Sequence, residues 1–175
     1  LKASSSCTKT SNAPYTNASS GPARYTDVYV PGNGQSQNPT LIVFHGGAWA
    51  GGDKADMAVF AGMMCRKGWV VFSANYRLSP EAAWPAQIID ARTAVRAVRA
   101  NASRWKVWPT KIAVAGVSAG GHLAALLGTA GNAHHPDWDG PDFAGTSGAV
   151  AAVASEAGPM DLTAWTGTSA ELISW

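Results

Sequence analysis

The chain has little charge and no long apolar run. Its lysine, arginine, aspartate and glutamate together make up 14% of 175 residues, and the net charge is only +2. So small a net charge gives no indication of a nucleic-acid partner. No apolar stretch is long enough to cross a bilayer, so we expect no membrane span. Hydrophobic residues make up 46% of the sequence, which is typical of a compact globular domain.

Cysteine is also scarce, because Cys7 and Cys65 are the only two. A disulfide between them would tie the first residues to the first predicted helix. Cys65 could equally be a free thiol buried in that helix. The sequence leaves both alternatives open.

The first residues differ in composition from the rest. Lys2–Gly21 is rich in serine, threonine, asparagine and alanine, with almost no large apolar residue. We therefore expect an extended or loosely packed arm over residues 1–24 and a single domain over 25–175. No charged segment followed by an apolar run begins the chain, so we expect no signal peptide in it. This arm, eight tryptophans and few lysines are typical of a mature secreted protein, which predicts a secreted or periplasmic location.

Predicted strands and helices alternate along the chain. The runs at 41–44 and 70–72 are continuously apolar, as expected for strands covered on both faces. Alternation of this kind predicts an α/β fold with a mostly parallel sheet and helices on both faces. The strands are expected at 25–30, 40–44, 69–74, 111–115 and 149–154, and the helices at 53–67, at 85–102 and directly after Ser118.

Ser118 is the strongest candidate for a catalytic residue. It lies in Gly-Val-Ser-Ala-Gly at 116–120, where an apolar run gives way to a helix-forming run. A serine between small residues at such a strand-to-helix turn is typical of a nucleophile elbow. The tight turn would expose the hydroxyl, and the helix that follows would direct its first amides, including that of Ala119, toward a developing negative charge.

A second motif, His-Gly-Gly-Ala-Trp at 45–49, follows the predicted strand at 40–44. Adjacent glycines let the backbone turn its N–H groups toward a ligand. Attack on an ester carbonyl would place negative charge on its oxygen, which preorganised donors stabilise. The sequence therefore predicts an oxyanion hole made by the amides of Gly46, Gly47 and Ala119.

With these motifs the chain resembles the α/β-hydrolase superfamily, within it the carboxylesterase branch, and most narrowly the bacterial feruloyl-esterase-like and hormone-sensitive-lipase-like esterases. The resemblance runs from Tyr25 to Trp165. It implies a serine esterase that acts on short-acyl, acetyl-sugar or hydroxycinnamoyl esters through an acyl-enzyme, without a cofactor. An arylformamidase-like amide hydrolase and a non-catalytic fragment are the alternatives. The motifs that carry it are H-G-G-A-W at 45–49, G-D-K at 52–54, N-Y-R-L-S-P-E at 75–81, Pro85, Asp90 and G-V-S-A-G-G-H-L-A-A-L at 116–126.

The resemblance also implies a triad in the chain order serine, acid, histidine. After Ser118 the only histidines are His122, His134 and His135. His122 lies one helical turn after the serine and is expected to be structural, and the other two lie in a turn-rich segment. Asp161 is a candidate acid, or alternatively a helix N-cap or turn residue. We therefore expect the last strands and the final helix of the fold to be absent from this chain, and a second chain or segment to supply the histidine and the acid.

The segment 134–142 is acidic and contains two histidines. Its spacing matches no closed ligand motif, so we expect no metal. The resemblance places this segment near the mouth of the substrate pocket, which suggests that Trp138, together with Trp49 of the glycine motif, contacts substrate.

Two expectations concern arginines. Arg92, Arg96 and Arg99 lie on one stripe of the predicted helix at 85–102, which is typical of a solvated helix face. Arg77 is expected to form an ion pair with Glu81 beside the glycine turn.

Overall fold

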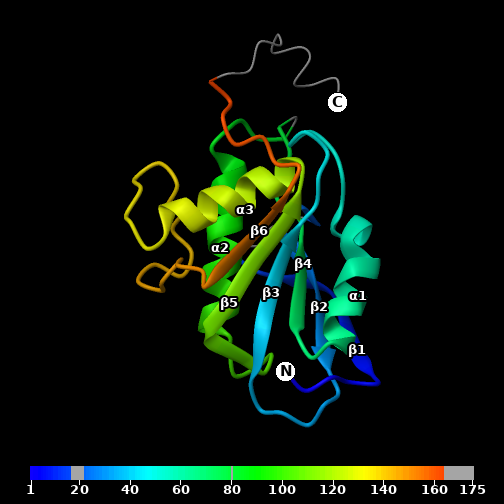
Figure 1. Ribbon diagram of the computed structural model, residues 1–175. Helices are drawn as coiled ribbons and strands as arrows, with labels where there is room; N and C mark the ends of the chain where they lie inside the picture. Colours follow the sequence, from blue (N-terminus) through cyan, green and yellow to red (C-terminus); the bar gives the residue numbers. More distant parts are fainter. Residues whose placement is uncertain (17–21, 80, 164–175) are drawn as a thin grey trace.

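The computed structural model describes residues 1–16, 22–79 and 81–163, and its centre is a six-stranded sheet in the order β1-β2-β4-β3-β5-β6 (Figure 1). Residues 17–21 of the predicted arm, Pro80 of the 75–81 motif and residues 164–175 of the predicted domain lie outside the described residues. The strands are β1 (Cys7–Pro14), β2 (Tyr25–Pro31), β3 (Asn38–Phe44), β4 (Val70–Ala74), β5 (Val107–Val117) and β6 (Ala152–Glu156).

Strands β3, β4, β5 and β6 run parallel, and β1 and β2 form an antiparallel edge beside β4. The prediction of a mostly parallel sheet is therefore confirmed. Because β3, β4, β5 and β6 point the same way, the segments that follow them meet at one end of the sheet. Both predicted turns, at 45–49 and around Ser118, follow such strands.

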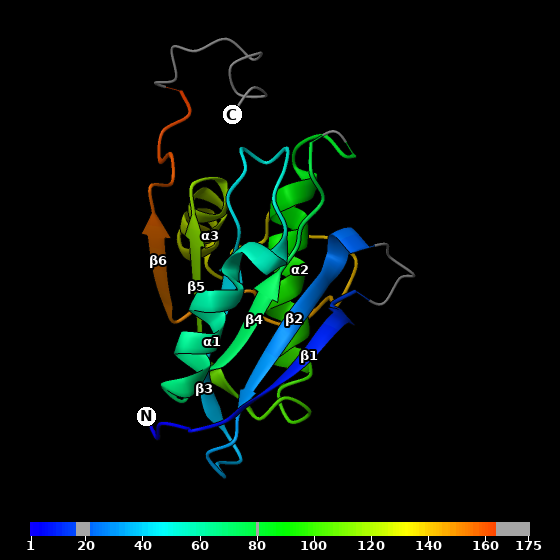
Figure 2. The same ribbon diagram turned by 90° about the vertical axis from the view of Figure 1, so that its right-hand side faces the viewer.

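Helices cover both faces, as Figures 1 and 2 show: α1 lies on one face, and α2 and α3 lie on the other. The position of β3 between two apolar cores explains why its sequence is continuously apolar. Its Leu41 and Val43 belong to the core on the α1 side, whereas Ile42 and Phe44 belong to the core on the α2 and α3 side. The helices are α1 (Ala58–Arg66), α2 (Ala86–Ala100) and α3 (Ala119–Ala130), with short 3₁₀ helices at Pro22–Arg24 and Lys54–Met57. None of the helices described is long and apolar enough to span a membrane.

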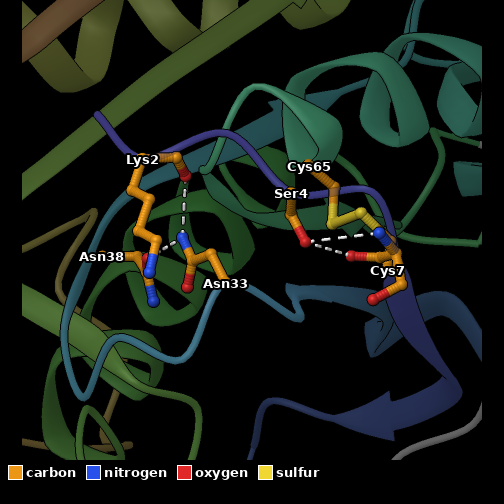
Figure 3. Close-up of a disulfide and its surroundings, with 7 residues drawn as sticks. Lys2, Ser4, Cys7, Asn33, Asn38 and Cys65 are labelled. Atoms are coloured by element: carbon orange, nitrogen blue, oxygen red, sulfur yellow. Dashed lines mark hydrogen bonds between the residues drawn. A yellow bond between two sulfur atoms is a disulfide. The ribbon is translucent and has the colours of Figure 1, made fainter.

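The first residues are joined to the sheet and to α1. Cys7–Pro14 is extended, as expected of the arm, but it pairs with β2 as an edge strand. Of the two alternatives for the cysteines, the structure has the disulfide, with the Cα atoms of Cys7 and Cys65 6.2 Å apart (Figure 3). Asn33 Nδ2 also donates to the carbonyl of Lys2 at 2.9 Å. The chain is thus fixed at Lys2 and again at Cys7, the first residue of β1.

The expectation of a solvated arginine face on α2 is wrong. Arg92 is 1% exposed and Arg96 is 8% exposed, and both donate to the carboxylate of Asp139. Arg99 donates to the carbonyls of Ser147 and Ala149. The segment between α3 and β6 packs against α2 and covers the stripe, so the arginines hold this segment instead of facing water.

The expected partner of Arg77 is also wrong. Its guanidinium donates from Nε and Nη2 to the two carboxylate oxygens of Asp90, at 2.9 and 2.8 Å. The backbone N–H of Arg77 donates to the same carboxylate at 2.9 Å. Asp90 lies in the second turn of α2 and is 1% exposed, so it fixes the loop after β4 from within the core.

Candidate active site

Ser118 lies between the end of β5 and the start of α3, with φ 53° and ψ −119°. This left-handed conformation is rare for a residue with a side chain. A Cβ at Gly116 would overlap the carbonyl of Gly120, so the turn is closed too tightly for larger residues. The Ser118 side chain is exposed, and its Oγ has no hydrogen-bond partner among the described residues. The hydroxyl therefore projects into solvent at the end of the sheet.

The glycine turn after β3 lies directly against Ser118. A Cβ built on Gly46 would be 3.3 Å from the Cβ of Ser118 and 3.1 Å from the carbonyl oxygen of Val117. A Cβ on Gly120 would overlap the carbonyls of Phe44 and His45. The structure thus brings the two predicted turns together, and only glycine allows the approach.

Two buried side chains fix the peptide groups of this turn. The Tyr76 hydroxyl donates to the His45 carbonyl at 2.9 Å, and His45 Nδ1–H donates to the Gly46 carbonyl at 2.7 Å. In a trans peptide the N–H points opposite to the C=O. The N–H groups of Gly46 and Gly47 are therefore directed away from Tyr76 and from the His45 ring. The amide of Ala119, in the first turn of α3, has no acceptor within its own helix.

His45 has a structural part in this turn. Its ring is 1% exposed and stacks on Tyr76, with ring centroids 4.4 Å apart. Burial disfavours the charged imidazolium and lowers the pKa of His45, while the contact with the Gly46 carbonyl raises it less. The neutral ring can donate from Nδ1 and so hold the Gly46 carbonyl.

None of the four histidines of the sequence reaches the Ser118 hydroxyl by a hydrogen bond within the described residues. His122 donates its backbone N–H to the Ser118 carbonyl at 3.0 Å, which places it one turn along α3. Its ring is 8% exposed, and burial lowers its pKa. His134 Nδ1 contacts Asp139 at 2.7 Å, and His135 stacks on Trp138.

Asp161 lies five residues after the end of β6 and is exposed. Its carboxylate accepts the backbone N–H of Thr163 at 2.9 Å and the hydroxyl of the same residue at 2.5 Å. This is the geometry of a turn residue. Its assignment as the triad acid stays a prediction. Glu156, at the end of β6, holds the serine turn through its backbone, because its carbonyl accepts the Ser118 N–H at 2.8 Å.

The acidic segment after α3 forms ion pairs. Burial alone would raise the pKa of Asp139, but hydrogen bonds from Arg92, from the His135 backbone and from His134 hold it well below its usual range. Within the described part of the chain, no group of three or more histidine, cysteine, aspartate or glutamate side chains could hold a metal ion.

Trp49 and Trp138, both predicted to contact substrate, are partly buried against the core on the α2 and α3 side. The Trp49 ring meets His122 edge-on, with centroids 5.2 Å apart. Trp84, which no sequence motif singled out, lies between His122 and Trp138 at centroid distances of 6.1 and 6.2 Å. Its position directly before Pro85, in the loop that leads into α2, is the one sequence signal that could have drawn attention to it.

Comparison with known proteins agrees with this arrangement. The chain is 44% identical over 96 residues to Esterase LipC and 39% identical over 126 residues to Esterase LipQ, both of Mycobacterium tuberculosis. These matches cover 54% and 71% of this chain, which spans only 24% and 29% of the two relatives.

Two solved structures are similar at 31% identity and a TM-score of 0.82. One is a bifunctional GH43-CE of Bacteroides eggerthii. The match covers 89% of this chain and 21% of that protein. The other is a truncated form of a carbohydrate esterase from gut microbiota. That match covers 93% of this chain and 59% of the esterase. The model of the BD-FAE family matches residues 26–173, which is most of the sequence. With its sheet order and its helices on both faces, the chain therefore belongs to the BD-FAE family of α/β-hydrolases.

Proposed function

We propose that this chain supplies the nucleophile and the oxyanion hole of a serine ester hydrolase. The observation that carries the proposal is the close approach of Gly46 to Ser118. A Cβ at position 46 would be only 3.3 Å from the Cβ of Ser118. This contact joins an exposed hydroxyl on a strained turn to a glycine turn whose peptide groups are fixed by Tyr76 and His45. In this reading Gly116–Gly120 is a nucleophile elbow.

The reaction follows from these positions. Ser118 Oγ attacks the ester carbonyl carbon, and the carbonyl oxygen takes up negative charge. The amides of Gly46, Gly47 and Ala119 donate to that oxygen, each contributing about 3–4 kcal/mol in the transition state. The alcohol then leaves, and water hydrolyses the acyl-enzyme to release the acid.

The proposal needs a general base that the four histidines of this chain do not provide. His45 holds the glycine turn, His122 is buried in α3, and His134 contacts Asp139. His135 is stacked on Trp138. We propose that a second chain or segment supplies the base, as the triad order of the resemblance implies.

The relatives support a choice of substrate class. Two of them are named esterases, and one structural neighbour is named a carbohydrate esterase. With the resemblance noted above, this favours short-acyl, acetyl-sugar or hydroxycinnamoyl esters. The disulfide between Cys7 and Cys65 supports a secreted or periplasmic location, because disulfides persist in oxidising compartments.

Ester hydrolysis by paired serine variants tests the proposal. Ser118→Ala is expected to lower kcat for 4-nitrophenyl acetate by at least about 1,000-fold, because it removes the nucleophile. Ser103→Ala, an exposed serine between α2 and β5, is the matched control and should keep wild-type turnover. Equal turnover by Ser118→Ala and the wild type would overturn the proposal. No turnover by the wild-type protein, assayed together with the chain or segment that supplies the base, would favour the non-catalytic alternative.

A further inference from the structure

A continuous line of aromatic rings runs from the glycine turn to the segment after α3. Trp49 contacts His122, His122 contacts Trp84, and Trp84 contacts Trp138, with successive centroid distances of 5.2, 6.1 and 6.2 Å. We call these four residues the aromatic wall. They come from four separate segments, so their assembly is a property of the fold.

The wall begins beside the proposed nucleophile. His122 lies one turn of α3 after Ser118, and Trp49 follows the oxyanion glycines by two residues. At the inner end of the wall two polar ring atoms are buried: neither Trp49 Nε1 nor His122 Nδ1 has a hydrogen-bond partner among the described residues. The inner pair therefore packs behind the site.

The outer end of the wall faces solvent. Trp84 is 50% exposed, and Trp138 is half-buried beside it at an interplanar angle of 78°. Two indoles at this angle offer one ring face and one ring edge to a molecule lying on them. An exposed indole is not unusual by itself, but this one is joined ring by ring to the residues around Ser118.

Trp138 is held in place before any ligand arrives. The His135 ring stacks on the Trp138 ring, with centroids 4.5 Å apart. The next residue, Asp139, accepts hydrogen bonds from the buried Arg92 and Arg96. A surface that is already ordered loses little conformational entropy when a ligand binds.

We propose that Trp84 and Trp138 form a stacking subsite for a ring carried by the ester substrate, next to Ser118. The inference rests on the proposed function and names the feature that the site selects. The shared chemistry is a ring with an apolar face, which either a hydroxycinnamoyl group on the acyl side or a sugar on the alcohol side can offer.

Three esters separate these cases in the full chain: ethyl acetate has no ring, methyl ferulate has an aromatic acyl group, and an acetylated methyl xyloside has a sugar ring. Trp84→Ala is expected to lower kcat/KM about 10-fold for one or both ring-bearing esters and to leave ethyl acetate unchanged. Loss with methyl ferulate alone identifies the acyl side, and loss with the xyloside alone identifies the alcohol side. Trp108→Ala is the control, since Trp108 is also exposed but lies near the start of β5, at the other end of that strand from Ser118.

A binding measurement separates failure of the subsite from failure of the proposed function. In the Ser118→Ala protein, saturation-transfer NMR should show contact with the ring protons of methyl ferulate or of the xyloside. The further change Trp84→Ala should remove this signal, and Trp108→Ala should keep it. Retained binding without turnover by the wild type, assayed together with the chain or segment that supplies the base, would support the subsite and contradict the esterase proposal. Unchanged kcat/KM for both ring esters in Trp84→Ala, or an equal loss with ethyl acetate, would overturn the subsite.

Discussion

At Ser118 the backbone holds φ 53°, and a conformation of this kind costs about 1–3 kcal/mol. The surrounding structure maintains it through close contacts. The Ser118 N–H is bonded to the Glu156 carbonyl at 2.8 Å, and Gly46 packs against the serine side chain. Strands β3, β5 and β6 thus contribute to one residue's conformation, and the hydroxyl stays exposed because its neighbours are small.

Gly46→Ala tests how closely the two turns must approach. Its Cβ would be 3.1 Å from the Val117 carbonyl and 3.3 Å from the Ser118 Cβ, so the serine must shift by a few tenths of an ångström. We expect kcat for 4-nitrophenyl acetate to fall about 10-fold with little change in KM, because the oxyanion geometry is disturbed. Gly51→Ala, whose Cβ would have no neighbour nearer than 4.0 Å, is the control. An unchanged kcat in Gly46→Ala would count against the oxyanion assignment.

At the scale of elements, the segment between α3 and β6 is held by ion pairs as well as by apolar contacts with the core. Arg92 and Arg96, on α2, share the carboxylate of Asp139, whose side chain is 13% exposed. A buried cation that loses its partner is costly because water does not replace the lost interaction. This ion-pair cluster therefore joins α2 to the segment that carries Trp138.

Asp139→Asn should lower the free energy of unfolding by about 3 kcal/mol, because two buried guanidinium groups lose their counter-charge. Urea denaturation of the variant and the wild type measures the difference. Asp137→Asn changes an exposed carboxylate in the same segment and should have little effect. Equal stability of the two variants would show that the cluster contributes nothing.

The disulfide acts between elements as well, since it joins β1 to α1 across 58 residues. Cys7→Ser with Cys65→Ser should lower the free energy of unfolding by about 2–4 kcal/mol, because the unfolded chain regains conformational freedom. Thermal unfolding followed by circular dichroism compares the double variant with the oxidised wild type. The wild type under reducing conditions, which also lacks the disulfide, is a second comparison. A melting temperature equal to that of the oxidised wild type would contradict this.

The sequence predicted where strands and helices form, but it did not predict which distant side chains they contact. The continuous run at 41–44 predicts a strand covered on both faces, and β3 is such a strand. The burial of Arg92 could not be predicted, because its partner is 47 residues away and the helix pattern alone resembles a solvated face. The two turns of the candidate site were predicted from glycine patterns. The line through Trp84 was not, because it depends on contacts between four segments.

At the scale of the whole molecule, the sheet separates two apolar cores, and buried polar groups lie at the end where the candidate site is. His45 and His122 lie at this end, and burial lowers the pKa of both. The folded protein therefore keeps them neutral at a pH at which the unfolded chain already binds protons. The free energy of unfolding therefore depends on the protonation of two rings that lie beside the candidate site.

This linkage predicts acid destabilisation. Below the ordinary histidine pKa of about 6.5 the unfolded state binds more protons than the folded state, so the free energy of unfolding decreases as pH falls. The slope is about 1.4 kcal/mol per pH unit for each histidine while the folded ring stays neutral. Urea denaturation at pH 8, 6.5 and 5 should show a plateau and then a fall, with a smaller fall in His122→Gln. A constant stability from pH 8 to 5 would contradict the prediction.

The central claim is that the Ser118 hydroxyl, held against the amides of Gly46, Gly47 and Ala119, is the nucleophile. Labelling the protein with a fluorophosphonate and mapping the adduct by peptide mass spectrometry tests it most directly. The account predicts one adduct, on Ser118, and none in Ser118→Ala. An adduct on a different serine, or no adduct on wild-type protein that hydrolyses 4-nitrophenyl acetate, would contradict it.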